Sequence, residues 1–270
     1  MNISYTKIDP AGNITVIVDS FVPREQQSRV AAELMKRDVT VEQVGFLEKP
    51  DDPCCAVRLQ MMGGEFCGNA SLSAAAVIFS RAGLAEGLYC EELFEVSGAP
   101  EPVKISGSMV NRTCFEGEVA MPLPESISEC SFLDGFEGYT FPLVRFPGIC
   151  HAIVPVGTIE RERAKAVIAS WCRQLGADAL GLMFFDRDKH TLTPLVYVAS
   201  TDTAVWEGSC ASGTAAAAYL AELDGEYASV RLTEPRGTVS ASATYSASQV
   251  RSLTMSNRAV IQGEFTALIF

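Results

Sequence analysis

Apolar and polar residues alternate along several stretches of the chain, a pattern that indicates a β-strand with one buried face. The clearest of these stretches cover residues 13–19, 55–61, 192–198 and 228–234. Two other segments, residues 24–37 and 160–175, repeat apolar residues at the spacing of an amphipathic helix. The pattern therefore predicts a chain that mixes strands with helices.

Two further helices are expected directly after two cysteines, near residues 68–82 and 211–223. Their sequences, NASLSAAAVIFS and SGTAAAAYLAEL, have no charged face over most of their length. A helix without a polar side is typically buried all round. Gly83 and Gly225 follow the two segments at positions that suit the end of a helix. The simplest architecture has two similar domains, each with strands wrapped around one central helix.

The boundary between the two domains is expected near residues 121–126, MPLPES, which are rich in turn-forming residues. The N-terminal domain would cover residues 1–120 and would be completed by a last strand at about residues 260–270. The C-terminal domain would cover residues 121–259. The expected fold class is α+β.

Charge and composition limit the classes of molecule that the protein is expected to bind. The formal net charge of −12 argues against a nucleic-acid backbone or an anionic membrane surface as a binding partner. The N-terminus lacks the basic and apolar segments of a signal peptide, and no apolar run reaches the roughly 18 residues of a membrane span. We therefore expect a cytoplasmic protein that binds a small molecule, with no nucleic acid and no membrane as partner.

The chain has nine cysteines, an odd number with irregular spacing, which does not indicate a disulfide framework. There is no CxxC pair and there are only two histidines, so no metal site is expected. Most of the cysteines are expected to be small buried apolar residues. Cys67 and Cys210 differ because each directly precedes one of the alanine-rich helices.

A cysteine at the start of a helix has a chemical use. The first turn presents backbone N–H groups without helical partners, and the helix dipole favours negative charge there. A thiol in this place loses its proton more easily, and the same N–H groups can hold a carboxylate. The groups in question belong to Gly68, Asn69, Ala211, Ser212 and Gly213.

Two such helix starts that met would hold one carboxylate between two thiols. One thiolate would then remove the α-proton of an amino acid, and the opposite thiol would deliver a proton to the other face. Fixed donors aimed at the carboxylate would stabilise the carbanion. Inversion at the α-carbon by this two-base transfer needs no metal and no organic cofactor.

The segments FCGNA (66–70) and CASGTA (210–215) resemble the two signature motifs of the diaminopimelate epimerase superfamily. Its members racemise or epimerise without pyridoxal phosphate. The resemblance implies a diaminopimelate epimerase-like fold, with two pseudo-symmetric domains that are each a β-barrel around a central helix. AGNITVIVD (11–19) resembles the family's N-terminal motif, which implies that Asn13 contacts the substrate. His151 lies where the family has a histidine.

The sequence also departs from the diaminopimelate epimerases. They carry a Glu-Arg pair nine residues before the second cysteine, where this chain has Thr201 and Asp202. Without that arginine, a distal carboxylate lacks its bidentate partner. The Asn-Pro before the family's histidine is replaced by Ile149 and Cys150. A substrate with two amino-acid ends is thus disfavoured.

Within the superfamily, the chain resembles the histidine racemases of staphylopine-type metallophore biosynthesis over nearly its whole length. The most specific segments are GNITVIVDS (12–20), EQVGFLE (42–48), EFCGNASLS (65–73), PLVYV (194–198) and VWEGSCASGTA (205–215). The resemblance implies that Cys67 and Cys210 are the catalytic pair, that Glu42 lies near the substrate and that Glu207 lies near Cys210. It also implies a homodimer, since homodimers are common among the relatives.

Several alternatives stay open at this point. Glu42 could accept an imidazole N–H of histidine, or it could simply cap a strand end. His151 could contact the substrate or be a satisfied half-buried histidine, and we expect no role for Glu65. The substrate could be another amino acid, including diaminopimelate, or a broad set of them. A cysteine hydrolase that uses Cys67 with His151, or a non-catalytic amino-acid-binding protein, would belong to a different class.

Overall fold

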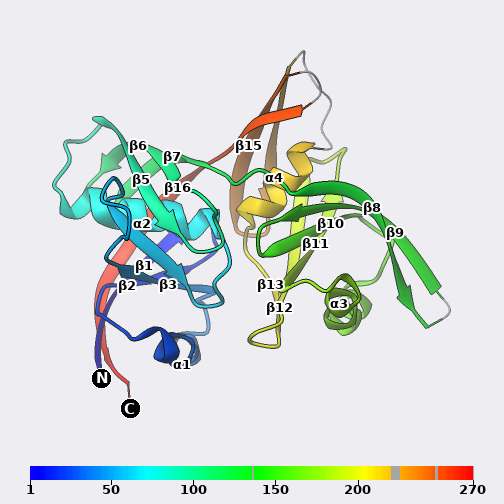
Figure 1. Ribbon diagram of the computed structural model, residues 1–270, viewed down its shortest axis with the longest axis horizontal. Coiled ribbons are helices and arrows are strands. Elements are labelled where there is room, and N and C mark those ends of the chain that lie inside the picture. Colours follow the sequence, from blue (N-terminus) through cyan, green and yellow to red (C-terminus); the bar gives the residue numbers. More distant parts are fainter. Residues whose placement is uncertain (136, 220–225, 247–248, 270) are drawn as a thin grey trace. The chain divides into compact units, whose positions relative to one another are not determined.

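The computed structural model describes residues 1–135, 137–219, 226–246 and 249–269 (Figure 1). These residues form four helices and sixteen strands, which confirms an α+β fold that is rich in strands. The chain divides into two compact units. Unit 1 consists of Met1–Met121 and Thr254–Phe270, and unit 2 consists of Pro122–Leu253. Within the described ranges, no helix has the length and apolar character needed to cross a membrane.

In unit 1 the strands form a closed ring. Their order is β1-β2-β3-β4-β5-β6-β7-β16, and β16 pairs back with β1. Each of these strands therefore has a neighbour on both sides, and no edge is left open. The strands are β1 (Asn2–Pro10), β2 (Thr15–Val18), β3 (Gln43–Glu48), β4 (Val57–Met61), β5 (Tyr89–Val96), β6 (Val103–Asn111), β7 (Cys114–Ala120) and β16 (Gln249–Leu268), which belongs to unit 1 from Thr254 onward.

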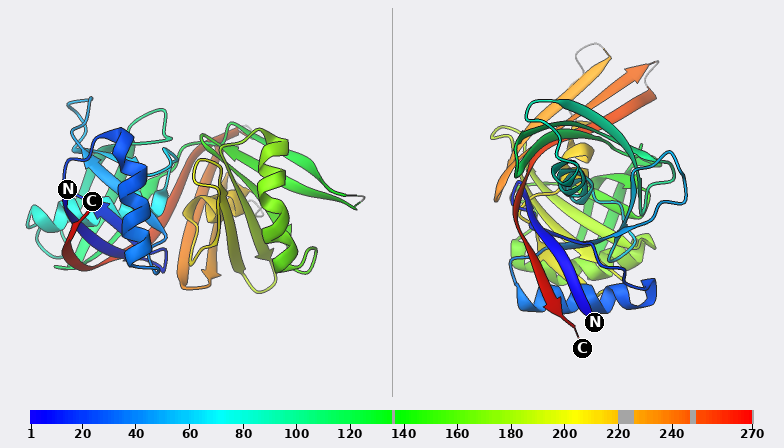
Figure 2. Two further views of the ribbon diagram at one scale, coloured as in Figure 1. Left: turned by 90° about the horizontal axis from the view of Figure 1, so that it is seen from below. Right: turned by 90° about the vertical axis from the view of Figure 1, so that its left-hand side faces the viewer.

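The helix α2 (Gly68–Arg81) lies inside this ring, and Figure 2 shows the strands of unit 1 running around it. It packs against β1, β2, β3, β6 and β7. Every side chain from Gly68 to Val77 is buried, as expected for a helix with no charged face. The second helix, α1 (Arg24–Arg37), is amphipathic and buries Val30, Ala31 and Leu34 against the core of β2 and β3.

Unit 2 also packs strands against a helix that follows a cysteine. Its described strands run in the order β8-β9-β10-β11-β12-β14-β15, and β13 pairs with β12. They are β8 (Ser126–Asp134), β9 (Glu137–Phe146), β10 (Ile149–Pro155), β11 (Ala179–Asp186), β12 (Thr191–Val198), β13 (Thr203–Trp206), β14 (Tyr227–Glu234) and β15 (Gly237–Ser246). The helix α4 (Ala211–Tyr219) packs against β10, β11, β14 and β15, and α3 (Arg161–Leu175) covers a separate core around Trp171.

The helices and strands expected from the hydrophobic pattern are confirmed. α1, α2 and α3 match the predicted segments to within one residue at each end, and the four clearest predicted strands correspond to β2, β4, β12 and β14. Gly83 follows the last residues of α2 with a φ of +68°, the left-handed conformation that ends helices. The expected end of α4 at residues 220–223 and the stop at Gly225 lie outside the described residues.

Candidate functional site

Cys67 is the N-cap residue of α2. Its Sγ atom accepts a hydrogen bond from the backbone N–H of Ala70 at 3.4 Å, and its carbonyl accepts one from the hydroxyl of Ser71 at 2.8 Å. The side chain is half-buried. The sulfur therefore lies at the end of the helix whose dipole favours negative charge.

The turn after β5 positions the segment that leads to Cys67. The hydroxyl of Ser97 accepts the N–H of Met61 and donates to the carbonyl of Glu65, both at 2.9 Å. Gly98 follows with a φ of +74°, and a Cβ atom there would lie 2.3 Å from the backbone nitrogen of Phe66. Only glycine permits this backbone conformation and this close approach together.

Asn13 and Glu42 lie together in unit 1. The side-chain amide of Asn13 donates to Oε2 of Glu42 at 2.9 Å, and Asn13 is buried. Asn13 lies two residues before β2, and Glu42 directly precedes β3, which is parallel to β2. β4 is antiparallel to β3, and Met62 at its end donates to the carbonyl of Val44. The start of β2, the start of β3 and the segment that leads to Cys67 therefore share one end of the unit.

Two other side chains in unit 1 belong to this end of α2. The buried amide oxygen of Asn69 accepts a hydrogen bond from Asn257 of β16 at 3.2 Å. Among the described residues, Oε2 of Glu65 finds no hydrogen-bond partner although it is buried. Burial raises the pKa of this carboxyl, and backbone N–H groups of Glu65 and Gly63 act in the opposite direction. Nothing in the sequence indicated that this carboxyl would be buried.

In unit 2, Cys210 directly precedes α4 and is buried. Its Sγ atom lies 3.7 Å from the hydroxyl of Ser212, and that hydroxyl lies 2.8 Å from Nε2 of His151. Burial lowers the pKa of His151 to about 3, so its imidazole is neutral at physiological pH. On the neighbouring strand β11, a Cβ atom at Gly181 would lie 2.4 Å from Nδ1 of His151, so this glycine makes room for the ring.

The electrostatic surroundings keep Cys210 in its thiol form. Burial raises the pKa of the thiol well above 9, and the carboxylates of Glu207 and Glu234 raise it further. The backbone N–H of Gly213 and the hydroxyl of Ser212 act in the opposite direction by hydrogen bonding to the sulfur. The predicted proximity of Glu207 to Cys210 is therefore present within unit 2.

Glu234 is a site residue that the sequence reasoning missed. Its Oε2 atom accepts the backbone N–H of Cys210 at 2.7 Å, and its Oε1 atom accepts the hydroxyl of Thr214 at 2.6 Å. The side chain is buried, and burial raises its pKa to about 8. The alternating pattern of β14 could have indicated that Glu234 is buried, because Glu234 falls on the same face of the strand as the buried residues Ala228 and Leu232.

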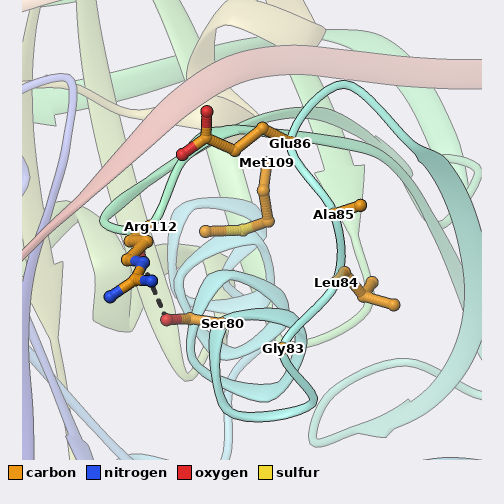
Figure 3. Close-up of a pocket in the computed structure, with 7 residues that line it drawn as sticks. All are labelled: Ser80, Gly83, Leu84, Ala85, Glu86, Met109 and Arg112. Carbon is orange, nitrogen blue, oxygen red and sulfur yellow. Dashed lines mark hydrogen bonds between the residues drawn. The ribbon is translucent and has the colours of Figure 1, made fainter.

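A cavity of about 500 Å³ lies at the other end of α2 (Figure 3). The hydroxyl of Ser80 donates to the carbonyl of Arg112 at its rim. At a rise of about 1.5 Å per residue, the length of α2 separates this cavity from Cys67 by roughly 20 Å. The cavity is therefore distinct from the cysteine site. Its lining residues are Ser80, Gly83, Leu84, Ala85, Glu86, Met109 and Arg112.

Comparison with known proteins gives the family. A family model described as the histidine racemase CntK N-terminal domain matches residues 2–267. The chain belongs to the histidine racemase family. A histidine racemase of Fusobacterium nucleatum is 32% identical over 245 residues, which cover 87% of each chain. A histidine racemase of Staphylococcus aureus is 28% identical over 228 residues, 79% of this chain and 77% of that one.

Solved structures agree on the fold. A hydroxyproline epimerase from Agrobacterium vitis, solved with bound trans-4-hydroxy-L-proline, matches with a TM-score of 0.67 at 12% identity and covers 98% of this chain and 91% of its own. A PhzF-family protein from Bacillus anthracis matches with a TM-score of 0.69 at 12% identity over the full length of both chains. At this identity the likeness shows the fold alone.

Membership of the histidine racemase family makes the protein an isomerase of the racemase class and confirms the resemblance seen in the motifs. The predicted site residues fall into two half-sites. In each one a cysteine precedes a buried alanine-rich helix, and its sulfur accepts the N–H of the residue three positions later. The predicted residues of unit 1 are Asn13, Glu42, Cys67, Gly68 and Asn69, and those of unit 2 are His151, Glu207, Cys210, Ala211, Ser212 and Gly213.

Proposed function

We propose that this member of the histidine racemase family interconverts L- and D-histidine by a two-base transfer of the α-proton between Cys67 and Cys210. The observation that carries the proposal is the duplication itself. Two cysteines in separate units each lie at the N-terminus of a buried helix. Inversion at carbon requires an acid and a base on opposite faces, and two half-sites supply one of each.

In one direction, the thiolate of Cys67 takes the α-proton as the Cα–H bond breaks and an S–H bond forms. The electron pair moves into the α-carboxylate. The thiol of Cys210 then gives its proton to the opposite face. The electron pair returns from the carboxylate to form the new Cα–H bond, and the electrons of the broken S–H bond stay on the Cys210 sulfur as a thiolate. The elevated pKa of Cys210 supports its assignment as the group that starts protonated. The reverse direction exchanges the two roles.

The carbanion is the costly species in this reaction, and it carries its charge on the substrate carboxylate. We assign the stabilising donors to the backbone N–H groups of Gly68, Asn69, Ala211, Ser212 and Gly213. Their positions in the first turns of α2 and α4 support this assignment. Helix N-termini favour negative charge, and donors fixed in advance do not reorganise when the charge develops. No metal or organic cofactor takes part in this mechanism.

Selectivity for histidine is assigned to Glu42 and Asn13. The carboxylate of Glu42 would accept an imidazole N–H of the substrate, and Asn13 would fix the orientation of that carboxylate through their hydrogen bond of 2.9 Å. Asp202, at the position where diaminopimelate epimerases have an arginine, instead accepts the phenol of Tyr197 at 2.9 Å. This contact supports a substrate without a distal carboxylate.

The remaining expectations belong to the same proposal. We infer that both units are β-barrels around a central helix, as in diaminopimelate epimerases, on the basis of the closed ring in unit 1 and the burial of α2 and α4. We expect a cytoplasmic homodimer whose D-histidine serves the biosynthesis of a metallophore.

The test is proton NMR of L-histidine with the reduced enzyme in D2O, beside a panel of other amino acids and diaminopimelate. We expect loss of the α-proton signal of histidine while the optical rotation falls toward zero. Exchange on another amino acid alone would keep the mechanism and reject histidine. Absence of exchange on every compound, with both cysteines reduced, would reject a racemase and favour a binding protein. Hydrolytic activity that survives in a Cys210 variant would favour a cysteine hydrolase.

A further inference from the structure

Different kinds of side chain support the two cysteine segments, although each segment is followed by a buried helix and then by a strand that ends beside it. In unit 1 the residue that follows β5 is Ser97, a neutral side chain that binds the backbone of Met61 and Glu65. In unit 2 the corresponding place at the end of β14 holds Glu234, a carboxyl group. In unit 2 a titratable group therefore stands at the strand end where unit 1 has the hydroxyl of Ser97.

The carboxyl of Glu234 accepts two hydrogen bonds at the start of α4. Its contact with the backbone N–H of Cys210 satisfies a donor that the helix itself leaves without a partner. Its contact with the hydroxyl of Thr214 reaches one turn further along the helix. Both partners are buried, as is the carboxyl, so the pair of hydrogen bonds fixes the residue that carries the thiol.

The same geometry places the Glu234 carboxyl and the Cys210 thiol, which both ionise to anions, in one buried space, with the carboxylate of Glu207 as a third anion nearby. Among the described residues, the titratable side chains near Cys210 include Glu207 from the preceding loop, Glu234 from β14 and His151 from β10, the last through Ser212. Arg236 donates its backbone N–H to the carbonyl of Gly208, and its residue is exposed. His151 stays neutral, so it does not compensate a negative charge.

We propose that Glu234 is a positioning residue for Cys210, and that its carboxyl and the Cys210 thiol share a single negative charge. This inference rests on the proposed function for its catalytic meaning. Two like charges at this proximity in a low dielectric disfavour each other strongly. A protonated Glu234 permits Cys210 to become a thiolate when it gives its proton to the carbanion. An ionised Glu234 opposes that step.

The test uses Glu234→Gln, which keeps an oxygen for the N–H of Cys210 and an amide for the hydroxyl of Thr214 but carries no charge. The Cys210 thiolate is measured by its absorbance at 240 nm across pH, as the difference between each protein and the same protein with Cys210→Ala. We expect the thiolate midpoint of the Glu234→Gln protein to fall by about one pH unit or more. Glu129→Gln, an exposed carboxylate on β8, serves as the control and leaves the midpoint in place.

Racemase activity separates this inference from the proposed function. Glu234→Gln should retain α-proton exchange on histidine and extend it to higher pH, whereas Glu234→Ala should lose most of it. An unchanged thiolate midpoint in Glu234→Gln would overturn the inference. A lowered midpoint in a protein that exchanges no α-proton in any variant would reject the proposed function and leave the role of Glu234 intact.

Discussion

His151 and Ser212 share a buried hydrogen bond of 2.8 Å between Nε2 and Oγ, and Ser212 is also the side-chain neighbour of the Cys210 thiol. The hydroxyl thus connects a neutral imidazole to the sulfur. Ser212→Ala removes the partner of Nε2 and should lower the free energy of unfolding by about 1–3 kcal/mol, the cost of an unsatisfied buried group. It should also slow racemisation, because the Cys210 thiol then loses the hydroxyl beside it.

The control for Ser212→Ala is Ser73→Ala. Ser73 is a buried serine of α2 whose hydroxyl donates only to a backbone carbonyl one turn earlier. Chemical denaturation and the initial rate of racemisation are measured for both variants. Equal losses of activity in the two variants would show that Ser212 has no special relation to Cys210.

Removal of either thiol should abolish inversion. Cys67→Ser and Cys210→Ser replace a thiol by a hydroxyl, which is a much weaker acid, and general acid–base catalysis contributes about 10²–10⁴-fold. Polarimetry of L-histidine follows the loss. Cys54→Ser changes an exposed cysteine and should keep full activity. A Cys210→Ser protein that still racemises at the parent rate would disprove the two-base mechanism.

Glu42→Gln should weaken histidine binding more than it slows the chemistry. The amide can still accept the hydrogen bond of Asn13, but the charge is lost, and a hydrogen bond to a charged group is worth about 1.5–3 kcal/mol. We expect KM for histidine to rise about tenfold or more while kcat changes less. Glu25→Gln, on the exposed side of α1, provides the control. A fall in kcat at constant KM would assign Glu42 to the proton transfer instead.

Gly98 and Gly87 allow a matched comparison, since their φ angles are +74° and +76°. Alanine at either position is strained by about 1–2 kcal/mol. A Cβ at Gly87 meets nothing within 4 Å, whereas one at Gly98 meets the backbone of Phe66 at 2.3 Å. Gly98→Ala should therefore destabilise the protein further and reduce activity through displacement of Cys67. Thermal unfolding and racemase rates that coincide for the two variants would contradict this role.

Two buried groups shape the dependence of stability on pH. His151 has a native pKa of about 3 against roughly 6.5 when unfolded. The unfolded chain therefore binds a proton that the native chain does not, and stability is lost as pH falls from about 6.5 toward 3. Glu234 has a native pKa of about 8 against a usual value of 4.5. Its contribution is complete below pH 4.5 and is lost as pH rises through 8.

Each group alone changes the free energy of unfolding by about 1.4 kcal/mol per pH unit. Between pH 4.5 and 6.5 the two changes have opposite signs, because a rise in pH adds stability through His151 and removes it through Glu234. We expect the free energy of unfolding to be flat in that window and to fall on either side. Urea denaturation at a series of pH values measures it. Glu234→Gln should remove the decline in stability above pH 6.5 and leave the decline in acid. If the variant still loses stability above pH 6.5, Glu234 is not the group responsible for that decline.

The sequence was most informative where the relation between residues is local. A cysteine followed by a run of small residues identifies the start of a buried helix, and both Cys67 and Cys210 lie there. The pairing of Asn13 with Glu42 could not be read from periodicity, because it depends on two strands that lie side by side. The family resemblance implied that both residues lie near the substrate, and the structure brings the two side chains together.

Three supports of the site were not predicted, for one physical reason. Ser97, Gly98 and Glu234 reach the cysteine segments through strand pairing, from at least 24 residues away along the chain. A glycine or serine after a strand is ordinary turn composition. The carboxyl of Glu234 was distinctive, since an acidic residue on the apolar face of a strand must find partners inside the protein.

The pairing of β16 with β1 joins the last strand of the chain to its first. During synthesis on the ribosome, residues 1–121 emerge long before residues 254–268. The strand that closes the ring of unit 1 between β7 and β1 is therefore missing until unit 2 has been made. Both strands then present unpaired backbone groups to other nascent chains. Termination of synthesis before β16 would leave Cys67 in a unit whose ring lacks one strand, and a chaperone that shields β1 and β7 would raise the yield of the complete protein.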